Sequence, residues 1–136
     1  MPTYDVEATY AKIFSKAGLF SVNGRRNRKP FFFLNWGINV CINIMDKFAA
    51  GSLVIGVLYL VFIYILFTNS AKRFHDLNHP TWFACYNFIV FIPFVFPTNH
   101  FDNTVILLIT VIIGLYTTFK KGTIGPNFYG PDPLEK

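Results

Sequence analysis

The chain has 136 residues, of which 53% are hydrophobic and 14% are charged. This composition is too apolar and too poor in charge for an ordinary soluble domain, and the length suits one domain. The net charge of +5 does not indicate nucleic-acid binding, because the basic residues lie beside long apolar segments, where they orient membrane proteins. We therefore expect a single all-α membrane domain, residues 1–136, with no nucleic-acid partner.

Residues 4–17 are predicted to form a short amphipathic helix that lies on the membrane surface. Val6, Tyr10 and Ile13 recur at helical spacing, and Lys12 lies on the opposite side. The first twenty residues contain four charged residues and no apolar core, so we expect no cleaved signal peptide.

A basic run follows, and it stands directly before the first long apolar segment. It contains Arg25, Arg26, Arg28 and Lys29. As pure charge, the run anchors the chain at the inner membrane surface and attracts anionic lipid. A second interpretation is that some of these arginines make bidentate contacts to carboxylates or phosphates, which lysine does not reproduce.

Four apolar segments are predicted to be transmembrane helices. Each has close to the ~20 residues that cross a bilayer. The first and second segments, and the third and fourth, have short connections between them, so we expect two antiparallel hairpins in a compact four-helix transmembrane bundle. Pro93 is expected to kink the third helix. The predicted spans are residues 30–47, 51–69, 80–97 and 103–119.

Three asparagines in the first span form a polar stripe. Asn35, Asn39 and Asn43 are spaced four residues apart, which puts their carboxamides on one side of a helix. The first interpretation is that they hydrogen-bond to other helices and hold the bundle together. The alternative is a polar track for a small solute or a lipid headgroup, as in a transporter, a channel or a holin-like pore subunit.

The segment before the third span superficially imitates a zinc-protease motif. His75 and His79 stand four residues apart with Asp76 between them, but no third ligand is evident and Pro80 follows at once. We expect no metal here and a salt-bridged turn in which Asp76 pairs with an arginine such as Arg73. Two cysteines, in the first and third apolar segments, are expected to be reduced packing residues.

The C-terminal tail, residues 120–136, is rich in Gly and Pro and is not expected to be a helix. One interpretation is a disordered end, and the other is a tail that folds back against the inner face. The distribution of charge places this tail inside. With four spans, eleven of the twelve Lys and Arg residues lie on the side of the N-terminus and only Lys47 lies on the other. Both termini are therefore predicted to be cytoplasmic.

Three polar segments carry ordered motifs. Their residues are Gly24, Arg25 and Arg28, with Phe20 a little further off; Arg73, His75, Asp76 and Trp82; and Gly122, Gly125, Asn127, Tyr129, Gly130, Asp132 and Pro133. Taken together, these segments resemble a bacterial inner-membrane family called domain of unknown function 805. The resemblance runs from about Tyr10 to Pro133, and it implies an inner-membrane location and a multi-span bundle, with no agreed activity. The chain departs from the family pattern at Phe74, where Leu is usual, and at Pro80-Thr81, where Ser-Gly is usual.

The predicted topology puts all three motifs on the cytoplasmic face. We expect a non-enzymatic membrane module without a cofactor, whose polar cluster holds the tail and the first helix together and engages an anionic lipid headgroup or a partner protein. Expected partners are the bilayer, anionic lipid, and a second copy or another membrane protein. A lipid-phosphate enzyme with His75 as base is a less favoured alternative. The cluster residues are Arg25, Arg28, Arg73, His75, Asp76, Asn127, Tyr129 and Asp132.

Overall fold

The structure is a computed structural model, and it describes residues 18–49, 53–89 and 100–134. Within these ranges the chain is all-helical and contains no strand, which confirms the predicted all-α class. The expected surface helix at 4–17 and the expected kink at Pro93 lie outside the described residues. The helices are α2 (Arg28–Ala49), α3 (Leu53–Asp76), the 3-10 helix η1 (Thr81–Cys85), α4 (Tyr86–Ile89) and α6 (His100–Phe119).

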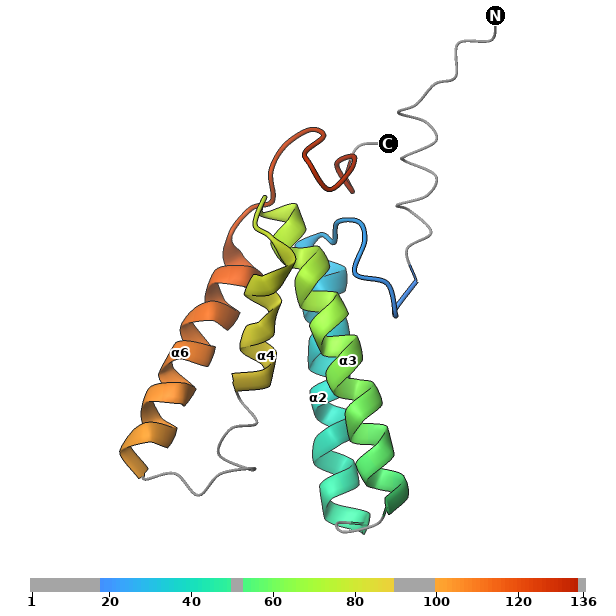
Figure 1. Cartoon of the computed structure of the whole chain (residues 1–136), viewed down its shortest axis with the longest axis vertical. Helices are drawn as coiled ribbons and strands as arrows, with labels where there is room; N and C mark the ends of the chain where they lie inside the picture. Colours follow the sequence, from blue (N-terminus) through green and yellow to red (C-terminus); the bar gives the residue numbers. More distant parts are fainter. Residues whose placement is uncertain (1–17, 50–52, 90–99, 135–136) are drawn as a thin grey trace, which may run out of the picture.

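The helices α2 and α3 lie side by side along most of their length (Figure 1). The 3-10 helix η1 and α4 pack against α3, and α6 contacts α2. The helices come together at the end where the C-terminal tail folds, and α6 diverges from α2 and α3 toward the opposite end (Figure 1). The C-terminal tail covers the end where the helices meet.

Two small apolar clusters hold α3 at the centre of this arrangement. In the first, Ile38 of α2 packs against Ile65 and Leu66 of α3. In the second, Ala71 and Phe74 of α3 pack with Ala84 and Tyr86 of the segment η1 and α4. Ala71 and Ala84 are fully buried, and their small side chains allow the two backbones to approach closely.

The C-terminus of α3 is closed by a left-handed residue. Asn78 has φ 61°, its N–H donates to the His75 carbonyl at 3.0 Å, and the His79 N–H donates to the Phe74 carbonyl at 2.8 Å. This pair of bonds is the Schellman arrangement that commonly ends helices. The helix reaches Asp76, about two turns beyond the span predicted from hydropathy, and those last turns are polar yet buried.

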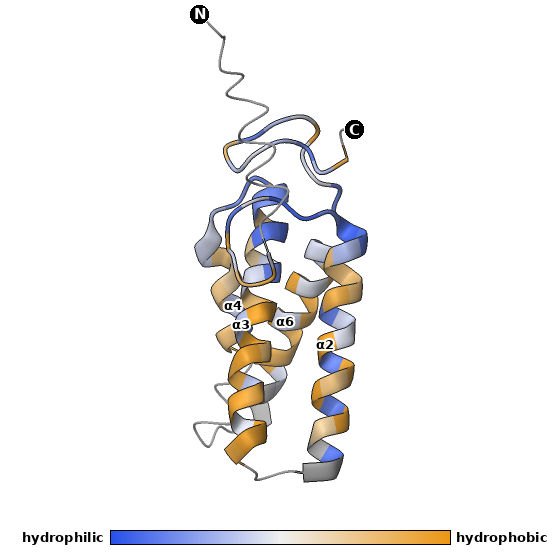
Figure 2. Ribbon diagram, turned by 90° about the vertical axis from the view of Figure 1, so that its right-hand side faces the viewer, coloured by the Kyte–Doolittle hydropathy of each residue, from blue (hydrophilic) through white to orange (hydrophobic). Residues whose placement is uncertain are grey.

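Apolar and polar residues are separated along the long axis of the molecule. The helix shafts are mainly hydrophobic, and hydrophilic residues gather at the end that carries the tail (Figure 2). Of the described helices, α3 is the one that is both long and apolar enough to cross a membrane by length and composition. The apolar stretch Thr104–Phe119 of α6 is shorter.

Candidate functional site

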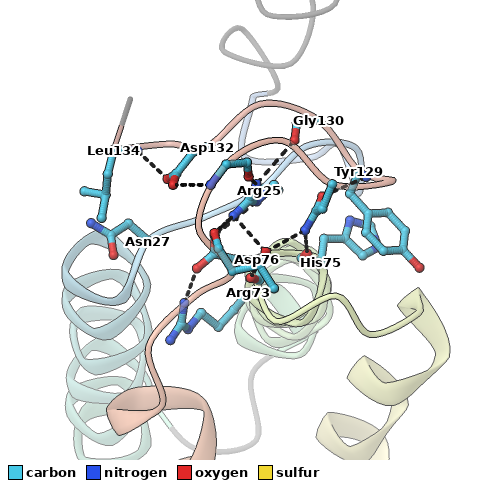
Figure 3. A network of polar contacts seen from close by, with 12 residues as sticks. Arg25, Asn27, Arg73, His75, Asp76, Tyr129, Gly130, Asp132 and Leu134 are labelled. Atoms are coloured by element: carbon cyan, nitrogen blue, oxygen red, sulfur yellow. Dashed lines mark hydrogen bonds and ion pairs between the residues drawn. The ribbon is translucent and has the colours of Figure 1, made fainter. Parts of the chain in front are cut away.

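A carboxylate shared by two arginines lies at the polar end of the bundle (Figure 3). The Oδ1 atom of Asp76 accepts from Nη2 of Arg25 at 2.9 Å and from Nε at 3.1 Å, and its Oδ2 atom accepts from Nη1 of Arg73. The three side chains are 3%, 1% and 0% exposed, respectively. We call these three residues the Arg–Asp–Arg cluster.

The Arg25 side chain joins the loop before α2 to the C-terminal tail. Its Nη1 atom donates to the carbonyls of Gly125 at 2.6 Å and Gly130 at 3.3 Å. Its Nη2 atom donates to the carbonyl of Thr123 and, at 3.0 Å, to the Thr123 hydroxyl. Every nitrogen of this guanidinium therefore has an acceptor within the chain, which satisfies a buried charge whose desolvation is costly.

The Arg73 side chain joins α3 to the C-terminus of α6. Its Nε atom donates to the Thr117 carbonyl at 2.7 Å, and its Nη2 atom donates to the Lys120 carbonyl. The last carbonyls of a helix lack partners within the helix and carry a partial negative charge. The Arg73 guanidinium satisfies the Thr117 carbonyl in the last turn of α6 and the Lys120 carbonyl directly after it, and its positive charge complements the negative end of the helix.

The C-terminal tail in turn closes the end of α3. The N–H of Thr123 donates to the Asp76 carbonyl at 2.8 Å, and Nδ2 of Asn127 donates to the His75 carbonyl at 2.8 Å. Asn127 also pairs with Gly130 in an isolated β-bridge. The tail is thus ordered through residue 134 and supplies donors that the end of α3 needs.

His75 has both ring nitrogens occupied. A carbonyl only accepts hydrogen bonds, so Nδ1–H donates to the Gly24 carbonyl at 3.0 Å, and Nε2 of the neutral ring accepts from the Thr81 hydroxyl at 2.8 Å. The ring of Tyr129 stacks on the imidazole with a centroid separation of 3.9 Å and an interplanar angle of 3°. The contacts of His75 position the loop before α2, the tail and η1 relative to one another, and neither ring nitrogen is free to act on a substrate.

The two histidines of the zinc-like pattern have different partners. His79 hydrogen-bonds to the Tyr116 hydroxyl of α6 at 2.7 Å, and Nζ of Lys120 donates to the same hydroxyl at 2.7 Å. His75 instead bonds to Gly24, as described above. Among the residues that the structure describes, no group of three His, Cys, Asp or Glu side chains is arranged to hold a metal ion.

A second set of contacts, missed by the sequence analysis, lies beside the cluster. Nη1 of Arg26 donates to Oδ1 of Asn69 at 3.0 Å, and Nδ2 of Asn69 donates to the Phe31 carbonyl at 3.1 Å. Burial lowers the pKa of the Arg26 guanidinium. A helical projection of α3 places Asn69 on the same side as the cluster, because Asn69, Arg73 and Asp76 follow i, i+4, i+7 spacing.

Two predicted cluster residues lie at its edge. Arg28 is exposed, and its Nη1 atom donates to the Phe119 carbonyl at 3.3 Å. Asp132 accepts from the backbone N–H groups of Leu134 at 2.9 Å and Gly125 at 3.1 Å, and the first of these bonds contributes most to lowering the pKa of its carboxyl. These two side chains, Asp76 and parts of the tail line a cavity of about 30 Å³, which is space for roughly two water molecules.

The asparagine stripe is separate from the cluster. Nδ2 of Asn39 donates to the Asn35 carbonyl and Nδ2 of Asn43 donates to the Asn39 carbonyl, both at 2.7 Å, so these amides bond to their own helix. Oδ1 of Asn35 is the one buried side-chain polar atom in the described ranges without a hydrogen-bond partner.

The three segments that meet at Asp76 are the polar motifs on which the family resemblance rests. The model of the family DUF805, described as a protein of unknown function, matches residues 19–131 of this chain. The chain belongs to this family. No curated protein and no solved structure matches it. The matched range of this DUF805 protein includes all three members of the Arg–Asp–Arg cluster and the tail as far as Pro131.

Asp76→Asn is expected to lower the stability of the protein by about 3–5 kcal/mol, because it leaves two buried guanidiniums without a counter-charge while preserving the shape of the side chain. The thermal unfolding midpoint of the purified protein measures the effect. The matched control is Asp132→Asn, which changes a carboxylate that accepts only from backbone N–H groups and lies at the edge. Equal losses in the two variants would contradict a special role for Asp76.

Gly122→Ala is expected to detach the tail from α3. A Cβ atom at this position would overlap the Asp76 carboxylate, with its Cγ only 2.6 Å away. Such overpacking typically costs about 1–3 kcal/mol. Limited proteolysis should then cut the tail faster than in the unaltered chain. The control is Gly114→Ala in α6, where nothing lies within 4 Å of the added carbon, so the cutting rate should stay unchanged.

Proposed function

We propose that this DUF805 protein is a membrane module with four transmembrane helices. The observation that carries this proposal is that α3, which is apolar enough to span a bilayer, has only 22% of its most apolar stretch buried within the chain. Leu53, Val54 and Leu60 are 85%, 68% and 68% exposed. A soluble protein buries the apolar faces of such a helix, whereas lipid solvates them on all sides.

The other long helices support the same proposal. The helices α2 and α6 have 22 and 20 residues, close to the ~20 that a bilayer requires. Large apolar side chains such as Trp36 of α2 and Leu107 and Ile112 of α6 are more than half exposed. The proposed third span, residues 80–97, begins with η1 and α4, and its later part lies outside the described residues.

The distribution of charge supports an orientation with the polar end in the cytoplasm of a bacterium. The Arg–Asp–Arg cluster, the tail and most described basic residues are at one end of the helices, whereas Lys47 is in the last turn of α2 at the other. Because Lys and Arg are retained on the cytoplasmic side, both termini are proposed to lie there, in an inner-membrane protein.

The module is proposed to bind an anionic lipid headgroup at its cytoplasmic face. The guanidiniums of Arg25 and Arg73 are buried and occupied by acceptors of the chain, so their role is to hold the loop, α3, α6 and the tail together. Headgroup binding then falls to basic side chains that remain exposed around the cluster. These are Arg28, Lys29, Lys120 and Lys121, which we call the basic rim.

The proposed topology predicts opposite labelling of the two ends of the molecule. In a background with Cys41→Ser and Cys85→Ser, a membrane-impermeant maleimide added to intact spheroplasts should label Lys47→Cys. It should label Leu134→Cys only after the membrane is permeabilised. Both positions are exposed, so accessibility within the protein does not differ. Labelling of both from the same side would overturn the four-span topology.

The basic rim predicts a lipid-specific stabilisation. Phosphatidylglycerol titrated into neutral-detergent micelles should raise the thermal midpoint of the protein, and phosphatidylcholine should not. The double variant Lys29→Gln/Lys121→Gln should weaken this effect roughly 30-fold in lipid concentration, since each basic residue contributes about 1 kcal/mol near an anionic surface.

The control for this experiment is Lys47→Gln, which removes an exposed charge at the far end of α2. It should leave the response to phosphatidylglycerol unchanged. An unchanged response in the double variant would reject the lipid proposal and leave a partner protein as the reason for the exposed charges.

A further inference from the structure

One side of α2 is exposed and carries a pattern typical of helix pairing. Phe32, Trp36, Asn39 and Asn43 follow one another at intervals of four, three and four residues, which is the a/d spacing of a coiled-coil seam. All four are exposed, with Phe32 at 44% and Trp36 at 61%. The opposite side of α2, which includes Ile38, packs against α3. This exposed seam is therefore separate from the contacts that form the described core.

The carboxamides in the seam have unused hydrogen-bonding capacity. Each of Asn39 and Asn43 uses one N–H on the backbone carbonyl one turn earlier. One N–H and the Oδ1 acceptor remain on each side chain, and the described part of the chain supplies no further bond to them. On α3 and α4, by contrast, the carboxamides of Asn69 and Asn87 are buried and bonded within the chain.

This inference rests on the proposed membrane location, which makes the exposure of the two amides costly. At ~1.5 Å per residue, Asn39 and Asn43 lie roughly 16 Å and 22 Å along α2 from Arg28, within a hydrocarbon core about 30 Å thick. Lipid tails offer neither donors nor acceptors, so an amide facing them loses the hydrogen bonds it makes in water. The seam thus requires a partner that presents both a donor and an acceptor at the same depth.

We propose that this partner is a second copy of the same chain, paired through α2 in a parallel dimer. A carboxamide is self-complementary, because its N–H can donate to the oxygen of an identical group while its own oxygen accepts. Two copies share one topology, so a twofold axis along the bilayer normal brings Asn39 opposite Asn39 and Asn43 opposite Asn43 at equal depth. Interhelical amide bonds of this kind stabilise membrane helix pairs by about 0.6–2 kcal/mol each.

The aromatic residues of the seam fit the same dimer. Phe32 and Trp36 lie on the cytoplasmic side of the amides in the proposed orientation, about two turns and one turn from Asn39, respectively, and would form the apolar part of the contact. No charged residue occupies these four positions. The helix ends also match, because parallel packing places the Arg28 end of each copy beside the other at the cytoplasmic face.

Cysteine cross-linking in native membranes tests the dimer. In the Cys41→Ser/Cys85→Ser background, Phe32→Cys and Trp36→Cys lie in the seam, whereas Phe33→Cys and Ile44→Cys are exposed on another side of the same helix. Because a disulfide needs Cα atoms within about 7 Å, the seam variants should form disulfide-linked dimers at least tenfold faster under a mild oxidant. Equal rates at the four positions, or no cross-link at any, would overturn the proposal.

Removal of the amides tests why the dimer forms. Asn39→Leu/Asn43→Leu, made in the Phe32→Cys protein, should reduce the cross-linking rate at least fivefold, and the matched change Ile44→Leu should not. An unchanged rate would overturn the amide mechanism. The maleimide topology assay on the same variants separates the two proposals, because a correctly inserted protein that does not cross-link refutes the dimer alone.

Discussion

The shared carboxylate of Asp76 is the interaction on which the rest of the polar end depends. Its two oxygens face guanidiniums from two different segments, and its own backbone carbonyl accepts from the tail. Through these two arginines, a single residue at the end of α3 connects the loop before α2, the end of α6 and residues 123–130. Burying one negative and two positive groups is costly unless every donor is occupied. Together with the Asp76 carboxylate, the backbone carbonyls of Thr117, Lys120, Thr123, Gly125 and Gly130 give each guanidinium nitrogen at least one acceptor.

The occupation of the guanidinium nitrogens by acceptors within the chain decides how the cluster contributes to function. Arginines that bind an external anion need donors that are free in the unbound protein, whereas each guanidinium nitrogen of Arg25 and Arg73 already donates within the chain. The cavity of about 30 Å³ beside them has space for roughly two water molecules. The cluster is therefore a structural element that shapes the polar end of the helices, and the charges available to a ligand are those of the basic rim. His75 follows the same pattern, because its ring is enclosed by Gly24, Thr81 and Tyr129.

The meeting of three polar motifs at one end follows from the sequence, because hydropathy and the count of basic residues place them on one side of the predicted bundle. That acceptors within the chain occupy the guanidinium nitrogens does not follow from the sequence, because these acceptors are mostly backbone carbonyls, which carry no side-chain signature. Hydropathy predicts that the second span ends at Asn69. The helix continues beyond this residue because Arg26 and the tail supply hydrogen-bond partners at its polar end. Spacing alone placed Asn39 and Asn43 on one side of α2. Which side faces outward depends on the packing of Ile38 against α3, which only the structure reveals.

The position of the polar cluster at one end of the helices affects how helices in lipid are held together. Apolar helix surfaces gain little free energy when they exchange contacts with lipid for contacts with one another. The arrangement of the proposed membrane helices therefore depends on polar contacts and close packing. Here the buried polar contacts of the described residues gather at the end that carries the tail, and α6 diverges from α2 and α3 toward the other. Away from that end, α2 and α3 are joined in the described residues by the apolar packing of Ile38 against Ile65 and Leu66. The proposed amide-mediated contact between the α2 helices of two copies would add a polar constraint in the membrane-embedded part of α2, away from the polar cluster.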